Sequence, residues 1–301
     1  VRARSRLTPA RPGIALLALP AALFVVVVFA VPMAGLGRMS FNETGPTGAM
    51  VPAFSFDIWR AMIEDSFTYE VTLNSMWLSF VSTTAALALA YPLALFLFRT
   101  TSRWKGFLIA AAITPMLVSG VVRVFGWLAI LGDRGFVNWH LAQAGLGGPY
   151  RLVYNFTGAA IGLTESLMPY MILALIAGFG RLDRTLEEAS ASLGASPLRT
   201  FVRVTLPLSL PAIVHGWLLC FVLAMSAYVT PKLLGGGRVF LLATEIYDQA
   251  ITTVNWPMAA ALAMYRRGLH AHFLAAWSAH DRRATARAAP APGACSPCSR
   301  R

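Results

Sequence analysis

The sequence predicts an all-α, polytopic membrane protein, and three observations support this. Of the 301 residues, 57% are hydrophobic and only 13% are charged, against about 25% charged residues in a typical soluble domain. The mean hydropathy is +0.62. Apolar runs of about 20 residues, long enough to cross a bilayer as helices, recur along the chain with charged residues between them. Much of the surface is therefore expected to face lipid.

Five apolar runs are long enough to span a membrane: 14–36, 72–98, 106–131, 157–179 and 212–234. A sixth run opens at Pro257 but contains only the eight apolar residues PMAAALAM before Tyr265 and Arg266, too few to cross a bilayer. The first run is longer than the apolar core of a secretory signal, and no clear A-x-A site follows it. We therefore expect an uncleaved anchor there.

These runs divide the chain into five parts. We predict a basic amino-terminal segment at 1–13, a membrane anchor at 14–36 and an external loop at 37–71. A core at 72–264 follows and contains a polar loop at 181–211, and an atypical basic tail occupies 265–301.

Basic residues predict the orientation of the chain. They are concentrated at the amino terminus and in the second and fourth loops, whereas the intervening loops are poorer in them: Arg2, Arg4, Arg6 and Arg11; Arg99, Arg103 and Lys105; Arg181, Arg184, Arg199 and Arg203. Since short cytoplasmic loops carry the excess of Lys and Arg, we expect the amino terminus and the even-numbered loops in the cytoplasm.

Several function classes are disfavoured by composition and motifs. The net charge of +12 is spread over short clusters between apolar runs, so membrane lipid, and not nucleic acid, is the expected surrounding. Cys295 and Cys298 resemble half a zinc site without a second pair. The chain has no G-x-x-x-x-G-K-[ST] phosphate loop, no H-E-x-x-H and no paired membrane aspartates. We therefore predict no catalytic residues, no metal and no cofactor.

The polar loop 181–211 has the most specific residue spacing in the chain. Glu188-Ala189-Ser190 is followed three residues later by Gly194, and nine residues separate that glycine from Val204-Thr205-Leu206-Pro207. Good helix formers run from 182 to 193, with acidic residues near the start, where the helix dipole favours them.

The same loop predicts a helix, a tight turn and a second helix. Gly194 can adopt the left-handed conformation that ends a helix. Ser196 can cap the next helix, with Pro197 at its first position. We expect Pro207 and Pro211 to break this second helix before the fifth span begins.

This spacing resembles the EAA loop by which permeases of bacterial ABC importers dock on their ATPase. Ser190 in place of the second alanine and Val204 in place of isoleucine are mild departures from the pattern. The resemblance assigns the coupling role to Glu188, Ala189, Ser190, Gly194, Ala195, Ser196, Leu206 and Pro207. Small side chains would let a partner groove approach closely, and Glu188 would supply one charge for a basic residue of the partner.

Further stretches, at 72–79, 114–138, 227–249 and 255–263, resemble permeases of spermidine/putrescine-type importers. The resemblance implies a type I ABC importer permease of the bacterial inner membrane, with a six-span core whose sixth span is incomplete here. It implies ABC ATPase subunits, a second permease subunit and an external substrate-binding protein as partners. A polyamine is the expected solute, although related permeases carry ferric iron, thiamine, betaine or phosphonates. The alternative is a secondary carrier that works without ATP.

Two ionisable residues, Arg123 and Glu165, lie within predicted spans, where an isolated charge is costly. Each lies eight residues, or ~12 Å, from the outer end of its span. Equal depth allows them to pair, and the alternative is that each faces the translocation path. Ser226 and Thr230 are further candidates for that path, with packing as the alternative for both.

After Met264 the family-like pattern gives way to a tail rich in arginine, alanine and histidine. Our hypothesis is a reading-frame change near codon 264. If the tail is genuine, the alternative is a non-functional permease truncated in its sixth span.

Overall fold

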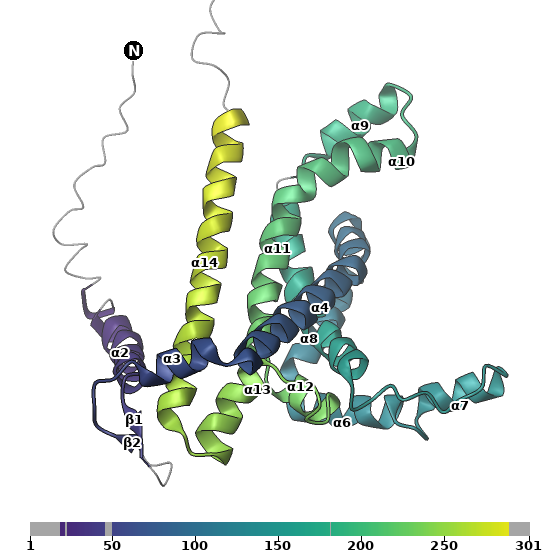
Figure 1. Cartoon of the computed structure of the whole chain (residues 1–301). Coiled ribbons are helices and arrows are strands. Elements are labelled where there is room, and N and C mark those ends of the chain that lie inside the picture. The colour runs from purple at the N-terminus through teal and green to yellow at the C-terminus, as the bar shows by residue number, and fades with distance from the viewer. Residues whose placement is uncertain (1–18, 22, 46–49, 181, 289–301) are drawn as a thin grey trace, which may run out of the picture. The chain divides into compact units, whose positions relative to one another are not determined.

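A computed structural model describes residues 19–21, 23–45, 50–180 and 182–288, and helices dominate it (Figure 1). The chain forms two compact units, which we describe separately. One comprises residues 66–245, and the other combines residues up to 65 with those from 246 onward.

Residues 66–245 carry the long helices of the protein. In chain order the elements are α4 (Ser66–Arg99), α5 (Lys105–Ile113), the 3-10 turn η2 (Thr114–Leu117), α6 (Gly120–Leu131), α7 (Phe136–Gln143), α8 (Phe156–Phe179), α9 (Arg184–Ser192), α10 (Pro197–Thr200), the π-helical turn η3 (Phe201–Thr205), α11 (Leu206–Ser226) and α12 (Val229–Leu234). The short helix α13 (Leu242–Tyr247) begins in this unit.

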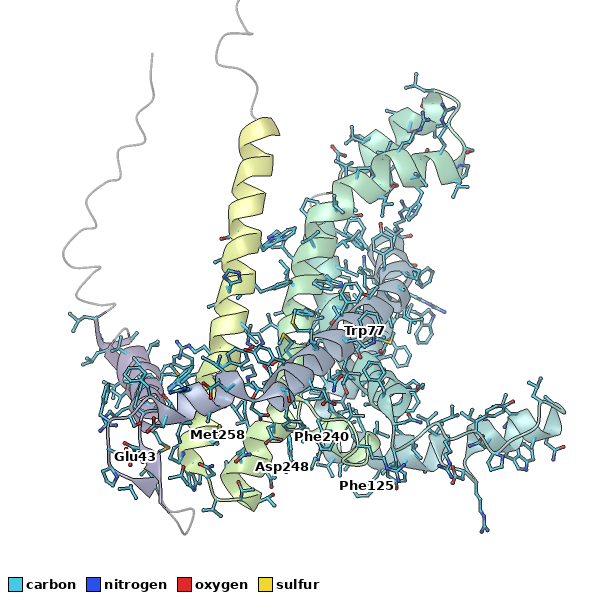
Figure 2. The ribbon with its side chains drawn as sticks, viewed as in Figure 1. Glu43, Trp77, Phe125, Phe240, Asp248 and Met258 are labelled. Carbon is cyan, nitrogen blue, oxygen red and sulfur yellow. The ribbon has the colours of Figure 1, made fainter. Side chains whose placement is uncertain are left out.

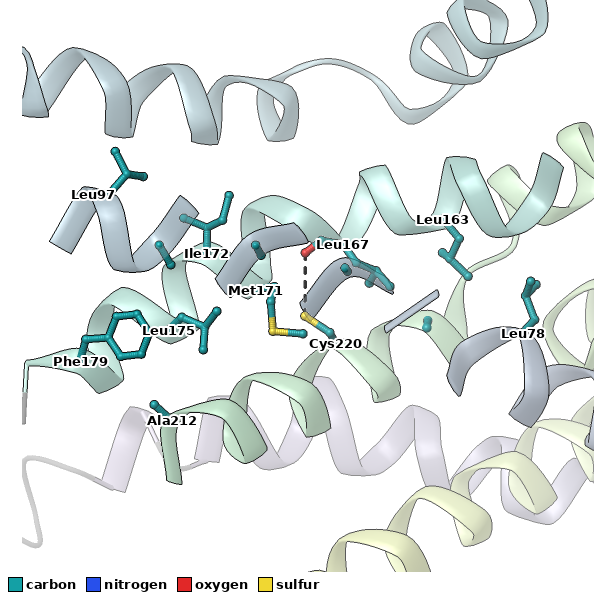
Figure 3. Packing of buried hydrophobic residues seen from close by; sticks show 14 of the residues in the cluster. Leu78, Leu97, Leu163, Leu167, Met171, Ile172, Leu175, Phe179, Ala212 and Cys220 are labelled. Atoms are coloured by element: carbon teal, nitrogen blue, oxygen red, sulfur yellow. Dashed lines mark hydrogen bonds between the residues drawn. The ribbon is translucent and has the colours of Figure 1, made fainter. Parts of the chain in front are cut away.

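The core of this unit lies between α4, α8 and α11 (Figure 3). Small residues bring the helices close, as expected where helices pack in a membrane. A Cβ atom at Gly178 of α8 would lie 2.2 Å from that of Ala212 of α11. Phe179, fully buried, ends α8 with edge-to-face contacts to Tyr91 and Phe98 of α4. The three helices therefore form one packed body.

Four helices are long and apolar enough to cross a membrane, or five if one bent pair is a single span, among the described residues. They include Leu19–Met39, Ser66–Arg99, Phe156–Phe179 and Pro197–Ser226. The fourth predicted span, 157–179, agrees with α8 to within one residue. Residues 14–18 and 22 of the predicted first span lie outside the described residues. Trp77 of α4 and Phe125 of α6, labelled in Figure 2, are exposed on the unit surface, as lipid-facing aromatics would be.

The prediction of one continuous third span at 106–131 is wrong. The segments Lys105–Leu117 and Gly120–Gln143, the second of which contains α6 and α7, are bent by 97° at the break between them. Pro115 lies in the 3-10 turn η2, and Val118 and Ser119 then take extended backbone angles. A proline has no N–H to continue the helical ladder, so the break at this site has a local cause.

The prediction that prolines break the helix before the fifth span is also wrong. Residues 197–226 form one helix of 30 residues. The N–H of Leu206 donates to the carbonyl of Phe201, five residues back, in the π-helical turn η3. This wider turn relieves the clash that Pro207 would cause in a regular helix. The fifth span is therefore not 212–234: α11 ends at Ser226, and α12 is a separate short helix.

The second unit contains the π-helical turn η1 (Val26–Ala30), α2 (Val31–Met39), the two-stranded sheet β1 (Glu43–Thr44) and β2 (Met50–Val51), α3 (Asp57–Glu64), the π-helical turn η4 (Asp248–Thr252) and α14 (Trp256–Ala288). The strands pair antiparallel, with Glu43 opposite Val51. Phe41 stacks on Phe54, with ring centroids 5.1 Å apart, and helps to order the segment between sheet and α3.

Helix α14 does not end with the apolar run. It continues past Met264 to Ala288, a length of 33 residues. Although it is long enough to span a bilayer, it is not among the described helices that are apolar enough to do so. Its backbone is therefore helical where its composition is no longer that of a membrane span.

Candidate functional site

Helix α9 begins at a capping aspartate. The N–H of Thr185 donates to Asp183 Oδ1 at 2.9 Å, and this hydrogen bond to the ionised carboxylate holds the pKa of Asp183 below its ordinary value. The helix covers 184–192, slightly less than the predicted 182–193.

The turn after α9 has the predicted chemistry. Gly194 has a φ of +80°, in the left-handed region, which favours glycine because it lacks a Cβ atom. Ser196 then caps α10, accepting from the N–H of Arg199 at 3.4 Å, and Pro197 occupies the first turn. The predicted helix, turn and second helix are confirmed.

The outward face of the loop combines small and apolar side chains. Glu188, Ala189, Gly194 and Ser196 are exposed. Sequence reasoning missed the two most prominent apolar residues: Leu193 is 88% exposed and Leu198 is 73% exposed. The sequence could have indicated their exposure, since large apolar residues are uncommon at the tip of a short polar loop. Leu206 and Pro207 are exposed at the start of α11, and Ala195 is half-buried.

The inward face carries polar contacts to the helical body. Arg99 Nη2 lies 2.5 Å from Glu187 Oε1, and Thr205 Oγ1 donates to the same oxygen at 2.7 Å. The hydroxyls of Ser190 and Thr200 are 3.0 Å apart. Ser190 is half-buried and bonds within the loop; its assignment to the docking surface stays a prediction.

The loop lies at one end of the helical body. In Figure 1, α9 and α10 lie beyond one end of α11, and α6 and α12 lie at its other end. Arg99 belongs to the second loop region and Glu187 to the fourth, and their contact puts both at the same end. This agrees with the charge alternation, which places even-numbered loops on one side of the membrane.

The two ionisable residues of the spans pair with each other. Arg123 Nη1 of α6 lies 3.4 Å from Glu165 Oε1 of α8, and both side chains are mostly buried. The indole N–H of Trp127 points to the other carboxylate oxygen of Glu165 at 3.5 Å. The pairing prediction is confirmed, and the pair compensates two charges that would be costly alone in a span.

The other two path candidates have different surroundings. Thr230 of α12 is buried, and its methyl group would be 2.9 Å from a Cβ atom at Gly162 of α8, one turn before Glu165. Ser226 is exposed and donates to the carbonyl of Val222 in its own helix at 3.1 Å.

Comparison with known proteins identifies the family. Residues 13–266 match the model of the family described as "Binding-protein-dependent transport system inner membrane component". The chain belongs to this family. It is a multi-pass inner-membrane permease of an ABC importer.

Two relatives and one solved structure extend this identification. The permease is 32% identical over 212 residues to the spermidine/putrescine transport system permease protein PotB of Escherichia coli strain K12, covering 70% of this chain and 77% of PotB. It is 30% identical over 281 residues to the inner membrane ABC transporter permease protein YdcU of the same organism, covering 88% and 89%.

A chain in the crystal structure of a bacterial ABC transporter involved in the import of alginate superposes with a TM-score of 0.71. It shares 18% sequence identity with the permease, and the match covers 90% of this chain and 95% of that one. The fold is that of a type I importer permease.

Proposed function

We propose that the permease couples ATP hydrolysis by ABC ATPase subunits to solute import, with α9 and α10 as the docking surface. The observation that carries the proposal is this surface itself: a capped helix, a left-handed glycine turn and a second capped helix with the spacing of an EAA loop. Exposed apolar groups such as Leu193 provide area to bury against a partner, and burial of apolar surface drives protein association.

The same proposal includes the orientation of the permease in the membrane and the partners of the permease. The amino terminus and the docking surface lie in the cytoplasm, as the distribution of Lys and Arg supports. A second permease subunit completes the translocation path, and an external substrate-binding protein delivers the solute.

A polyamine is the solute we propose, and the similarity to PotB supports this choice. Glu165 is engaged by Arg123 and Trp127, so we do not assign polyamine binding to its carboxylate. Selection of the cationic solute then rests with the external binding protein, and residues of the path need only let it pass.

The test is uptake of radiolabelled spermidine into proteoliposomes that hold the full importer with its ATPase and binding protein. We expect ATP-dependent, vanadate-sensitive uptake and co-purification of the ATPase with the permease. Uptake driven by an ion gradient without ATP would support the secondary carrier instead. Co-purification of the ATPase without spermidine uptake would overturn the choice of solute alone.

A second proposal concerns residues 265–301, which we infer to be read out of frame, leaving the sixth span incomplete. The family match stops at residue 266, two residues after the change in composition, and this supports the inference. Resequencing the gene together with mass spectrometry of the tail tests it. An intact frame with the observed tail peptides would overturn it.

A further inference from the structure

Three elements meet at one carboxylate oxygen, and one of them, α4, is distant in the chain from the other two. Glu187 Oε1 of α9 accepts hydrogen bonds from Arg99 Nη2, at the end of α4, and from Thr205 Oγ1, at the end of η3. The same Arg99 nitrogen lies 3.4 Å from the Thr205 hydroxyl. Thr205 is fully buried, and Glu187 is about a quarter exposed. We call Arg99, Glu187 and Thr205 the brace.

Helix α9 depends on polar contacts of this kind for its placement. No residue of α9 is buried among those whose side chains the structure describes. An open pocket of about 240 Å³ lies beside it, lined by Ala191, Ala195, Pro197, Thr200 and Phe201 together with the brace. The Ser190–Thr200 hydroxyl contact joins α9 to α10 only. The brace therefore joins α9 to the body of the permease.

The brace leads to a helix that the loop does not reach through the backbone. The loop connects α8 with α11, whereas Arg99 belongs to α4, a helix of 34 residues. Tyr91 of α4 adds one contact to η3 and one to α11: its ring centroid lies 6.1 Å from that of Phe201, and its hydroxyl lies 2.9 Å from that of Ser209. A displacement of α9 can thus be transmitted to α4 through direct side-chain contacts.

We propose that Arg99, Glu187 and Thr205 are positioning residues that transmit the movement of the ATPase-docked helix α9 to α4. The inference rests on the proposed docking of an ATPase at this loop, and it names the contact through which docking moves the core. Glu188, the next residue, is exposed and belongs to the docking surface, whereas Glu187 faces the body of the permease. Neighbouring glutamates in one helix thus have separate roles.

The structure suggests variants that preserve the fold. Arg99 is 43% exposed and Glu187 is 26% exposed, and ion pairs with this degree of exposure contribute little to folding stability. Glu187→Gln keeps the size of the side chain and removes its charge. Thr205→Val keeps the shape and removes the hydroxyl. Arg60→Gln is the matched control, because it removes the exposed Arg60–Glu64 ion pair of α3, which measures 2.7 Å.

The experiment measures movement of α4 without requiring a known solute. In the full complex, with the native cysteines replaced by alanine, a bimane fluorophore is attached at Leu89→Cys, an exposed position on α4. Fluorescence is recorded before and after trapping the ATPase with ATP and vanadate. ATPase retention and ATP hydrolysis are measured on the same samples.

We expect a clear fluorescence change in the parent complex and in Arg60→Gln, and a change at least threefold smaller in Glu187→Gln. Thr205→Val should reduce it about twofold. ATPase retention and hydrolysis should stay within twofold of the parent. The swapped pair Arg99→Glu with Glu187→Arg should recover more than half of the change lost in either single reversal.

Four outcomes would overturn the brace. The first two are a fluorescence change in Glu187→Gln equal to that of the parent, and no fluorescence change in the parent complex. The third is a loss of ATPase retention in Glu187→Gln as large as its loss of fluorescence change. The fourth is a fluorescence change in the swapped pair no larger than in Arg99→Glu or Glu187→Arg alone. A parent permease that retains no ATPase would instead overturn the proposed docking function on which the brace rests.

Discussion

Helices α8 and α9 follow one another in the chain and each carries a glutamate paired with an arginine, yet they are held in different ways. In α8, 11 of 24 residues are buried, and Glu165 pairs with Arg123 between two helices of the body. In α9 no described side chain is buried, and Glu187 pairs with Arg99 near the surface. The comparison separates a helix fixed by packing from one fixed by polar contacts, whose outward face remains free for a partner.

The largest effect is expected from Glu165→Gln in α8. It leaves the Arg123 charge without its partner among mostly buried groups, which costs on the order of 3 kcal/mol. The purified permease should lose thermal stability in detergent, measured as the midpoint of its aggregation. The double variant Arg123→Gln with Glu165→Gln removes both charges and should recover most of that loss. A double variant as unstable as the sum of the singles would contradict the pairing.

The packing of α8 is tested by Gly178→Ala. The new Cβ atom would lie 2.2 Å from that of Ala212, so α8 and α11 must separate, at a cost of about 1–3 kcal/mol. Thermal stability measures the loss. Ala212→Gly in the same chain moves the methyl group to the other helix and should restore most of the stability. No loss in Gly178→Ala would show that the two helices are less closely packed than in this structure.

For α9 and its turn, the prediction concerns binding and not stability. Leu193→Asp places a charge at an exposed position, so the fold should tolerate it, whereas ATPase retention should fall at least tenfold, or about 1.4 kcal/mol. Retention is measured by co-purification at graded ATPase concentrations. Leu146→Asp, at an exposed leucine of another loop, is the matched control. Equal ATPase retention in both variants would show that Leu193 is not part of the docking surface.

The smallest effect is expected at the cap of α9. Because hydrogen bonding lowers the pKa of Asp183, its contribution to helix stability is present above its ordinary pKa of about 4 and is lost as the pH falls through the lower folded value. The hydrogen-exchange protection factors of the α9 amides, which correct the exchange rates for the intrinsic effect of pH, should therefore fall modestly on acidification below about pH 4. Asp183→Asn keeps a capping side chain without a titrating group and should abolish this pH dependence. A persisting dependence would assign it to another group.

The sequence could predict those parts of the structure that depend on neighbouring residues or on depth in the membrane. Helix α8 agrees with its apolar run because little interrupts that run, and Gly194 with Ser196 predicted the turn after α9. The Arg123–Glu165 pair was predictable, since the membrane supplies a depth coordinate for each residue. Arg99 and Glu187, 88 residues apart, lie in two loops predicted on the same side of the membrane. The sequence does not indicate which side chains of these loops meet, so their contact required the structure.

The errors have equally physical causes. Prolines at 115 and 207 look alike in sequence, but one lies in a 97° bend and the other follows a π-helical turn that keeps the helix continuous. The backbone next to each proline differs: extended angles follow Pro115, whereas a π-helical turn precedes Pro207. The identity of the proline alone does not predict which of the two occurs.

The central claim, that α9 and α10 form the docking surface for the ATPase, is tested most directly by photocrosslinking in the full complex. A benzophenone amino acid is placed at Leu193, and in a second chain at Phe136, an exposed apolar residue of α7 at the other end of the same unit. We predict ATPase crosslinks from position 193 and none from position 136. Crosslinks from both positions alike, or from neither, would contradict the account.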